Sequence, residues 1–319
     1  MDQIQNSTLY LILKSMRPKQ WIKNLALYAA LVFSGFFFYD PRDAAPYFVT
    51  VTFAFIIFCF LASGIYIIND ILDVESDRQH PFKKKRPIAS GKLSVPIALF
   101  AAMTLFAIVF LASFWLSLFF KFMVLSYLVL QIIYVKYTKH IAIFDVISIA
   151  AGFLIRIYAG AVVVNLHMSV WFLLTVISAS LFLAVGKRQS ERTLLSGKIV
   201  GDTRKTLKRY SQRLLDQYTG MFANATWLTY ALFTFEGDAT IPPYSLATFY
   251  SFLPKALQSQ KLLMLTVPLV VFGVMRYLQL VYEDNEGESP EKVLLRDKPL
   301  LMTVFIFALL VMFIIYGLG

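Results

Sequence analysis

The stretch FVTVTFAFIIFCFLASGIYII occupies residues 48–68 and is followed directly by NDILDVESDRQHPFKKKRP at residues 69–87. The first part contains no charged residue and has the length that a helix needs to cross a bilayer, roughly 20 residues. The second part begins with four carboxylates within eight residues and then becomes basic. Ionisable residues at a membrane span are costly unless they have partners. This stretch therefore predicts a polar site at the end of a membrane helix.

The composition extends this prediction to the whole chain. Hydrophobic residues make up 58% of the 319 residues and charged residues 15%, whereas soluble domains are about 45–50% apolar and about 25% charged. We therefore expect an all-α, multi-pass membrane helical bundle in which residues 1–319 form a single domain. The single cysteine, Cys59, excludes an intramolecular disulfide and a zinc site built from cysteines.

Nine apolar runs are long enough to cross a membrane as helices. They lie at residues 25–39, 47–69, 96–117, 119–135, 143–163, 169–186, 221–236, 261–280 and 299–317. Before the first run, the segment RPKQWIKN at residues 17–24 alternates cations and a tryptophan with apolar residues, which is typical of the membrane interface. We expect about nine transmembrane helices around a central cavity.

The distribution of positive charge predicts the orientation of these helices. With the N-terminus inside, the segments that alternate to the cytoplasmic side hold 25 of the 30 lysines and arginines. This predicts a protein of the cell (inner) membrane with a cytoplasmic N-terminus, an external C-terminus, and a cavity and active site that open to the cytoplasm. The net charge of +11 is then explained by loops that face anionic membrane lipids, and not by binding to nucleic acid.

The acidic residues after residue 68 have the chemistry of a magnesium site. If the helix continues through them, Asn69, Asp73 and Asp77 repeat every four residues and share one face with Asp70. Hard oxygen ligands at this density suit Mg²⁺, which binds through carboxylates together with substrate phosphates. In the alternative interpretation, the acids only cap the helix end and pair with the cations at 83–86.

Basic segments near this cluster predict phosphate binding. Lys83 and Arg86 follow the acids directly, and a guanidinium such as that of Arg86 can bind phosphate oxygens bidentately. Lys187 and Arg188 follow the sixth apolar run and form either a second phosphate-binding edge or a simple interfacial anchor. Two further candidates for substrate binding, Lys136 and Lys139, lie in the short basic segment at 134–140.

Two ionisable residues fall within the fifth apolar run. Asp145 and Arg156 are eleven residues apart, which places them on one helix face but about 16 Å apart along its axis, too far to pair. Each then needs a partner on another helix or a bound ligand. We favour a polar cavity that both side chains line, with structural pairing between helices as the alternative.

The motif Asn-Asp-x-x-Asp-x-x-x-Asp at residues 69–77 resembles the first aspartate-rich motif of the UbiA-type intramembrane prenyltransferase superfamily. In most of that superfamily a second acidic motif follows the sixth helix, but here GKRQSE occupies residues 186–191. The chain is most similar to the decaprenyl-phosphate phosphoribosyltransferases. The similar segments are RPKQWIKN at 17–24, NDILDVESDRQHP at 69–81 and RPIASG at 86–91.

This resemblance implies a glycosyltransferase that moves 5-phosphoribose from phosphoribosyl pyrophosphate to a polyprenyl (decaprenyl) phosphate and releases pyrophosphate, in the synthesis of a cell-wall precursor. Mg²⁺ would be the cofactor, with Asn69, Asp70, Asp73 and Asp77 as its ligands. The resemblance makes Asp73, Asp77 and Asp145 catalytic, with Asp145 near the ribose. The resemblance also implies that the substrates are bound by basic residues. Lys19, Lys23 and Arg156 would lie beside the lipid phosphate, and the other candidates are Lys83, Arg86, Lys136, Lys139, Lys187 and Arg188.

Two other functions remain open on the sequence. The first is a magnesium-dependent prenyltransferase that uses prenyl diphosphate and an aromatic acceptor. The second is a polyprenyl-phosphate carrier without catalysis. The sequence also leaves open whether the protein is a homo-oligomer.

Overall fold

The computed structural model describes residues 7–79, 83–196, 210–236, 261–283 and 290–317, and every regular element in these residues is helical. Seven helices, taken with adjoining short helical segments, have the length and hydropathy to cross a membrane, so the chain is a multi-pass membrane protein. They are α4 (Tyr47–Leu72), α6 (Val95–Ser113), α7 (Leu118–Lys136), α8 (Phe144–Val163), α9 (Val170–Ser196), α12 (Val267–Tyr282) and α14 (Lys298–Met312).

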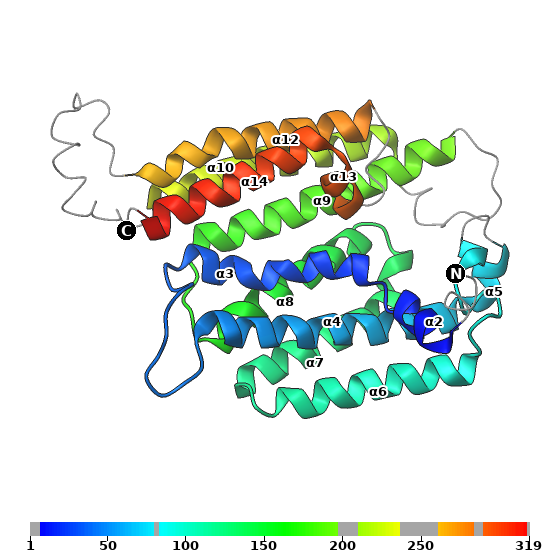
Figure 1. Ribbon diagram of the computed structural model, residues 1–319. Helices are drawn as coiled ribbons and strands as arrows, with labels where there is room; N and C mark the ends of the chain where they lie inside the picture. Colours follow the sequence, from blue (N-terminus) through cyan, green and yellow to red (C-terminus); the bar gives the residue numbers. More distant parts are fainter. Residues whose placement is uncertain (1–6, 80–82, 197–209, 237–260, 284–289, 318–319) are drawn as a thin grey trace, which may run out of the picture. The chain divides into compact units, whose positions relative to one another are not determined.

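The other helices are not among these seven spans, and Figure 1 labels the α-helices among them. The α-helices are α2 (Thr8–Ser15), α3 (Tyr28–Phe33), α5 (Val74–Gln79), α10 (Gln212–Glu236) and α13 (Pro290–Arg296). The 3₁₀ segments are η1 (Pro18–Leu27), η2 (Lys83–Lys85), η3 (Thr138–His140) and η6 (Leu262–Thr266), and η7 (Phe313–Gly317) is a π-helical turn.

Two of the nine predicted spans differ from the structure. The run at 25–39 is divided between the 3₁₀ segment η1 and the six-residue α3, and Gly35, with a φ of +79°, follows the end of α3. The run at 221–236 is the second half of α10, whose first half is polar. The described residues thus confirm the other seven spans, while the predicted number of nine is not confirmed.

The chain divides into two compact units, which are described separately. The first comprises Met1–Leu31, Phe36–Lys136 and Ile155–Leu166, and the second comprises Val32–Gly35, Tyr137–Leu154 and His167–Gly319. Helix α8 begins in the second unit and ends in the first. The single domain inferred from composition stays a prediction.

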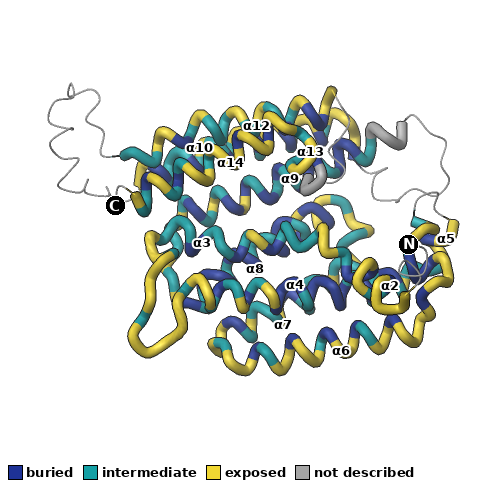
Figure 2. Tube along the Cα trace, in the orientation of Figure 1, coloured by how far each residue is buried: buried dark blue, intermediate teal, exposed yellow. Residues whose placement is uncertain are grey.

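Helix α4 is the central element of the first unit. Of its most apolar stretch 61% is buried, against 22% for α6 and 11% for α7, and Figure 2 shows the more exposed surface of α6. Phe58 packs on Phe120 and Tyr127 of α7, and Gly64 leaves room for Phe106 of α6. These contacts fix the direction in which α4 presents its polar C-terminal end.

Segment η1 lies against α8 at Gly160. A Cβ added to Gly160 would lie 1.9 Å from the carbonyl oxygen of Leu27, and this neighbour is backbone, which cannot rotate away. Glycine is therefore required here for packing. The contact holds η1 where it supplies Asn24, which is 1% exposed, to the interior.

Replacing Gly160 by alanine is expected to destabilise the protein by about 3 kcal/mol and to lower the midpoint of thermal unfolding in detergent by roughly 6 °C or more. The matched control is Gly220→Ala on α10, where an added Cβ meets nothing within 4 Å. That control is expected to keep or slightly raise the midpoint, because alanine favours the helix. Equal midpoints for the two variants would contradict the close contact.

In the second unit, α9 packs along α10, and α12 packs on α14 (Figure 1). Tyr277 lies on Phe182 with ring centroids 5.2 Å apart. Asp297 caps α14 by accepting from the backbone N–H of Leu300 at 2.8 Å, and it also accepts from Arg276 of α12 at 2.7 Å. The hydrogen bond from Arg276 holds the pKa of Asp297 below its usual range, so the charged carboxylate links the two helices.

Candidate active site

The polar site of the first unit begins where α4 ends. Helix α4 stops at Leu72, Asp73 adopts φ −95° and ψ 9°, and α5 begins at Val74. The backbone N–H of Asp77 still donates to the Asp73 carbonyl at 2.8 Å, so the chain turns by one residue and then resumes a helical course. The condition on which the shared face was inferred, a helix that continues through residues 69–77, is therefore interrupted at Asp73.

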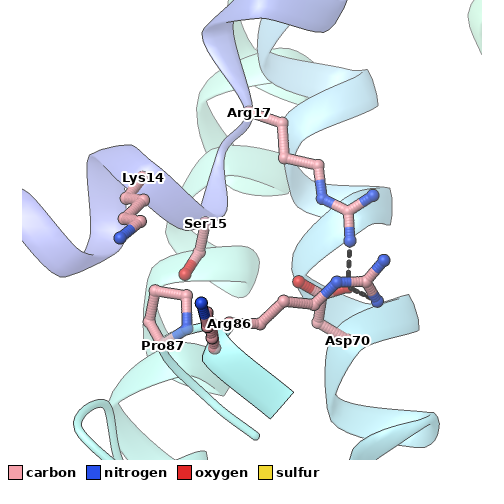
Figure 3. Close-up of a pocket in the computed structure, with 7 residues that line it drawn as sticks. Lys14, Ser15, Arg17, Asp70, Arg86 and Pro87 are labelled. Carbon is pink, nitrogen blue, oxygen red and sulfur yellow. Dashed lines mark hydrogen bonds and ion pairs between the residues drawn. The ribbon is translucent and has the colours of Figure 1, made fainter. Parts of the chain in front are cut away.

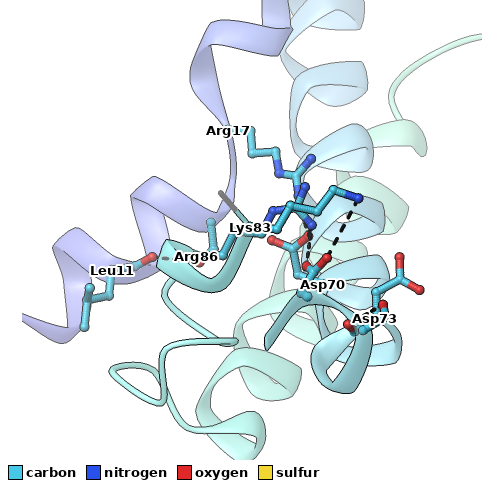
Figure 4. A network of polar contacts seen from close by, with 9 residues as sticks. Leu11, Arg17, Asp70, Asp73, Lys83 and Arg86 are labelled. Carbon is cyan, nitrogen blue, oxygen red and sulfur yellow. Dashed lines mark hydrogen bonds and ion pairs between the residues drawn. The ribbon is translucent and has the colours of Figure 1, made fainter. Parts of the chain in front are cut away.

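Two buried carboxylates share one guanidinium in this region. Arg86 donates to Asp77 Oδ2 at 2.5 Å and to Asp70 Oδ1 at 3.1 Å, while Lys83 Nζ lies 4.0 Å from Asp77 Oδ1 (Figure 4). Arg17 also donates to Asp70 Oδ1. Asp70 and Asp77 are only 3% and 2% exposed, and buried carboxylates require such partners. We call these five residues the α4 site.

In the structure, Asp70 and Asp77 pair with cations at 83–86, as in the alternative interpretation of the sequence. Asp70 also pairs with Arg17, a cation that the sequence analysis did not select. Arg17 stands between α2 and η1 with φ 53° and ψ 60°. This left-handed conformation costs about 1–2 kcal/mol for a residue other than glycine. The guanidinium also lies 5.1 Å from the Tyr66 ring centroid. The only signal in the sequence was the motif at 17–24.

The four predicted metal ligands are not assembled as a protein-only cage. In the described residues no group of three or more His, Cys, Asp or Glu side chains is placed to hold a metal ion. Figure 4 shows the Asp73 carboxylate turned away from Arg86, while Asp70 accepts from two arginines. The donor chemistry of Asn69, Asp73 and Asp77 fits Mg²⁺ held by one or two carboxylates together with substrate phosphates. Metal ligation stays a prediction.

Arg156 forms a second buried group in the first unit. It is 6% exposed, and it donates from Nε to Asn24 Oδ1 at 2.8 Å and from Nη2 to the Tyr127 hydroxyl at 2.6 Å. Asn24 in turn donates to Cys59 Sγ at 3.3 Å. These partners come from η1, α7 and α4, so structural pairing between helices, the less favoured alternative, describes Arg156 in this structure.

The second unit holds a cluster around Asp145, which is 1% exposed at the start of α8. Arg188 of α9 lies with Nε 2.7 Å from Asp145 Oδ2 and donates to Glu191 Oε2 at 2.5 Å. The Tyr210 hydroxyl donates to Asp145 Oδ1 at 2.7 Å. We call Asp145, Arg188, Glu191 and Tyr210 the α8–α9 cluster. Asp145 of α8 thus pairs with Arg188 of α9, which is the structural pairing between helices that the sequence analysis ranked below a polar cavity.

Tyr210 is, with Glu191, one of the two members of this cluster that the sequence analysis did not select. It is 1% exposed, and burial, followed by its hydrogen bond to Asp145, raises the pKa of Tyr210 above its usual value, so it remains a neutral donor. Its hydroxyl also accepts from the backbone N–H of Ile143 at 2.5 Å. Ile143 has a φ of 72°, which is rare for a β-branched residue.

The remaining predicted cations lie near the ends of helices. Lys187 is half-buried, and its Nζ is 3.9 Å from Glu191 Oε1. The others are Lys19, exposed on η1; Lys23, half-buried on η1; Lys136, exposed at the end of α7; and Lys139, half-buried on η3. Their roles in substrate binding stay predictions.

Comparison with known proteins agrees with this architecture. The model of the UbiA prenyltransferase family matches residues 26–296. A decaprenyl-phosphate phosphoribosyltransferase of Corynebacterium glutamicum is 33% identical over 314 residues, which cover 96% of this chain and 86% of the relative. The protein of the same name from Mycolicibacterium smegmatis is 39% identical over 230 residues, 71% of each chain.

A solved structure shows the same fold. A UbiA homologue from Archaeoglobus fulgidus, bound to DMAPP and Mg²⁺, superimposes with a TM-score of 0.65 at 16% identity, covering 96% of this chain and 99% of the homologue. The family match extends over the acidic end of α4 to α13 and therefore includes the α8–α9 cluster and every residue of the α4 site except Arg17. The chain belongs to the UbiA prenyltransferase family.

Proposed function

We propose that this protein transfers 5-phosphoribose from phosphoribosyl pyrophosphate to a polyprenyl phosphate, with decaprenyl phosphate as the acceptor suggested by its relatives. The observation that carries the proposal is the similarity to decaprenyl-phosphate phosphoribosyltransferases at 33–39% identity, in one case over 96% of the chain. The α4 site supports it, because three cations surround two buried carboxylates there. Such a group binds phosphate oxygens through charge-assisted hydrogen bonds.

The reaction breaks one bond and forms another at the anomeric carbon of ribose. The bond to a pyrophosphate oxygen breaks and its electron pair leaves with pyrophosphate, while an oxygen of the polyprenyl phosphate forms the new bond. Because this attacking oxygen is already anionic, no general base is required. The main task of the protein is to stabilise charge on the leaving group.

Within the α4 site, Arg86 and Lys83 are proposed to hold oxygens of the leaving diphosphate, with Asp70 and Arg17 positioning Arg86. Asp73 and Asp77, with Asn69, would hold Mg²⁺, which when bound neutralises diphosphate charge. Asp145 is proposed to contact the ribose, and Lys187 and Arg188 to contact further phosphate oxygens. The lipid phosphate is proposed to bind near Lys19, Lys23 and Arg156, and the α4 site to face the cytoplasm.

One specific observation favours a second candidate, prenyl transfer to an aromatic acceptor, because the matching family model carries the name prenyltransferase. Against it, Lys187 and Arg188 stand where most of the superfamily has acids. One assay separates the candidates: purified protein with Mg²⁺, labelled phosphoribosyl pyrophosphate and polyprenyl phosphate. We expect a labelled lipid. No labelled lipid, together with normal turnover of prenyl diphosphate, would overturn the proposal, and neither product would indicate a carrier.

Replacing Asp73 by asparagine is expected to lower turnover by at least about a hundredfold, because an amide carries no charge to hold the cation. Asp73 is half-buried, so the variant should unfold at the same temperature as the unaltered protein. The matched control is Glu75→Gln, since Glu75 is exposed on the neighbouring turn. Full activity of the Asp73 variant across a magnesium titration would remove the metal hypothesis.

A further inference from the structure

A cavity of about 250 Å³ lies beside the α4 site, within the first unit. It is lined by Lys14, Ser15, Arg17, Asp70, Lys85, Arg86 and Pro87. Figure 3 shows Lys14 and Ser15 of α2 on one side, and Arg86 reaching from the segment after η2 to Asp70. The cavity is smaller than the roughly 300–1,000 Å³ of pockets that enclose whole drug-sized ligands. It therefore suits one polar group of a larger molecule.

The charge of this lining favours an anion. Four cations face one carboxylate, and two of the four, Arg17 and Arg86, already pair with Asp70. Lys14 and Lys85 are exposed, and within the described part of the chain they form no ion pair. Lys14 and Lys85 therefore contribute two positive charges to the lining of this cavity, and neither charge pairs with a carboxylate of the α4 site.

Both walls of the cavity are held by the core of the first unit. Leu11 of α2, Met16 directly after α2 and Ile88 after η2 belong to one hydrophobic cluster with Ile67 of α4. The Met16 carbonyl also accepts from Ser63 Oγ of α4 at 3.1 Å. Because α2 and the 83–88 segment pack on the same helix, the lysines are held on either side of a preformed cavity.

We propose that this cavity is the subsite for a phosphate monoester, the 5-phosphate of the sugar donor, with Lys14 and Lys85 as its specificity-determining residues. A phosphate monoester carries about −1.5 to −2 charges at neutral pH, which matches the two lysines. This inference rests on the proposed function. Asp70 borders the cavity and belongs to the α4 site, so one donor molecule can place its leaving diphosphate and its other phosphate on two sides of the same carboxylate.

A lipid phosphate has the same headgroup chemistry, and α2 exposes Leu9 and Leu13 as an interfacial helix would. Steady-state kinetics separates the two sources. The test variant is Lys14→Gln with Lys85→Gln, the charge-preserving variant is Lys14→Arg with Lys85→Arg, and the matched control is Lys84→Gln. Lys84 is an exposed neighbour that does not line the cavity.

For the glutamine double variant, we expect the KM for phosphoribosyl pyrophosphate to rise about ten- to a hundredfold. Its kcat and its KM for polyprenyl phosphate should stay within about twofold of the Lys84→Gln control, because neither lysine belongs to the α4 site. A donor without the 5-phosphate, ribosyl 1-pyrophosphate, should react equally with the double variant and the control. The arginine double variant should recover most of the donor KM.

The outcomes separate the two proposals. A double variant that matches the control in every constant, while the unaltered protein makes the labelled lipid, overturns the subsite and leaves the proposed function standing. A rise in the acceptor KM alone assigns the cavity to a lipid phosphate and also overturns the donor subsite. If the unaltered protein makes no labelled lipid, the proposed function fails, and the donor subsite fails with it. Calorimetry with ribose 5-phosphate provides a second readout: binding by the control and its loss in the double variant support the subsite.

Discussion

Replacing Arg86 by alanine is expected to reduce kcat/KM by about a hundred- to a thousandfold and to destabilise the folded protein by about 3–5 kcal/mol. Both effects have one cause. Arg86 contacts both buried carboxylates of the α4 site, Asp70 at 3.1 Å and Asp77 at 2.5 Å. Without it, two carboxylates of like charge remain buried together, and the proposed diphosphate site loses its bidentate donor.

Two further variants separate charge from geometry. Arg86→Lys keeps the positive charge but lacks the planar guanidinium that binds phosphate oxygens bidentately, so it should recover part of the stability and little of the activity. Lys84→Ala removes an exposed cation two residues away and should change neither quantity. Turnover is measured with labelled donor, and stability by thermal unfolding in detergent. Wild-type values for the alanine variant would show that Arg86 is only a surface cation.

The sequence was sufficient to predict those structural features that depend on local composition. Helix α4, expected at 47–69, was found at Tyr47–Leu72, because a long apolar run has no alternative to helix within a membrane. At residues 25–39 the prediction from hydropathy was wrong, because hydropathy measures the apolar content of a segment and not the type of helix that the segment forms. The segment satisfies the hydropathy criterion, but its helical part is short and is preceded by a 3₁₀ segment.

Features that depend on distant partners were not predictable from spacing. The four-residue repeat of the acids implied one continuous face, but Asp70 and Asp77 meet at Arg86 while Asp73, at the turn after α4, is directed away from it. Asn24 lies 132 residues from its partner Arg156, and Tyr210 lies 65 residues from Asp145. The sequence showed that both buried charges need partners, but the choice between a neighbouring helix and a ligand depends on tertiary packing.

The α8–α9 cluster gives the second large effect. Replacing Arg188 by methionine is expected to cost about 3–5 kcal/mol of stability, because Asp145 and Arg188 have side chains only 1% and 2% exposed and their pair atoms are 2.7 Å apart. The methionine leaves the Asp145 carboxylate buried, where the neutral hydroxyl of Tyr210 still donates to it. A double variant, Asp145→Asn with Arg188→Met, removes both charges and should recover most of the loss, because a neutral pair of similar volume carries no desolvation penalty.

Activity then distinguishes a structural pair from a substrate-binding one. If Arg188 and Asp145 serve only to join α8 to α9, the double variant should regain turnover along with stability. If Arg188 contacts phosphate oxygens and Asp145 contacts the ribose, as proposed, the double variant should unfold near the temperature of the unaltered protein yet remain at least about a hundredfold slower. Arg213→Met is the matched control, since Arg213 is exposed on α10 and should leave both quantities unchanged. We expect recovered stability without recovered turnover, because Lys187 and Arg188 stand where the resemblance to the superfamily led us to expect a second acidic motif.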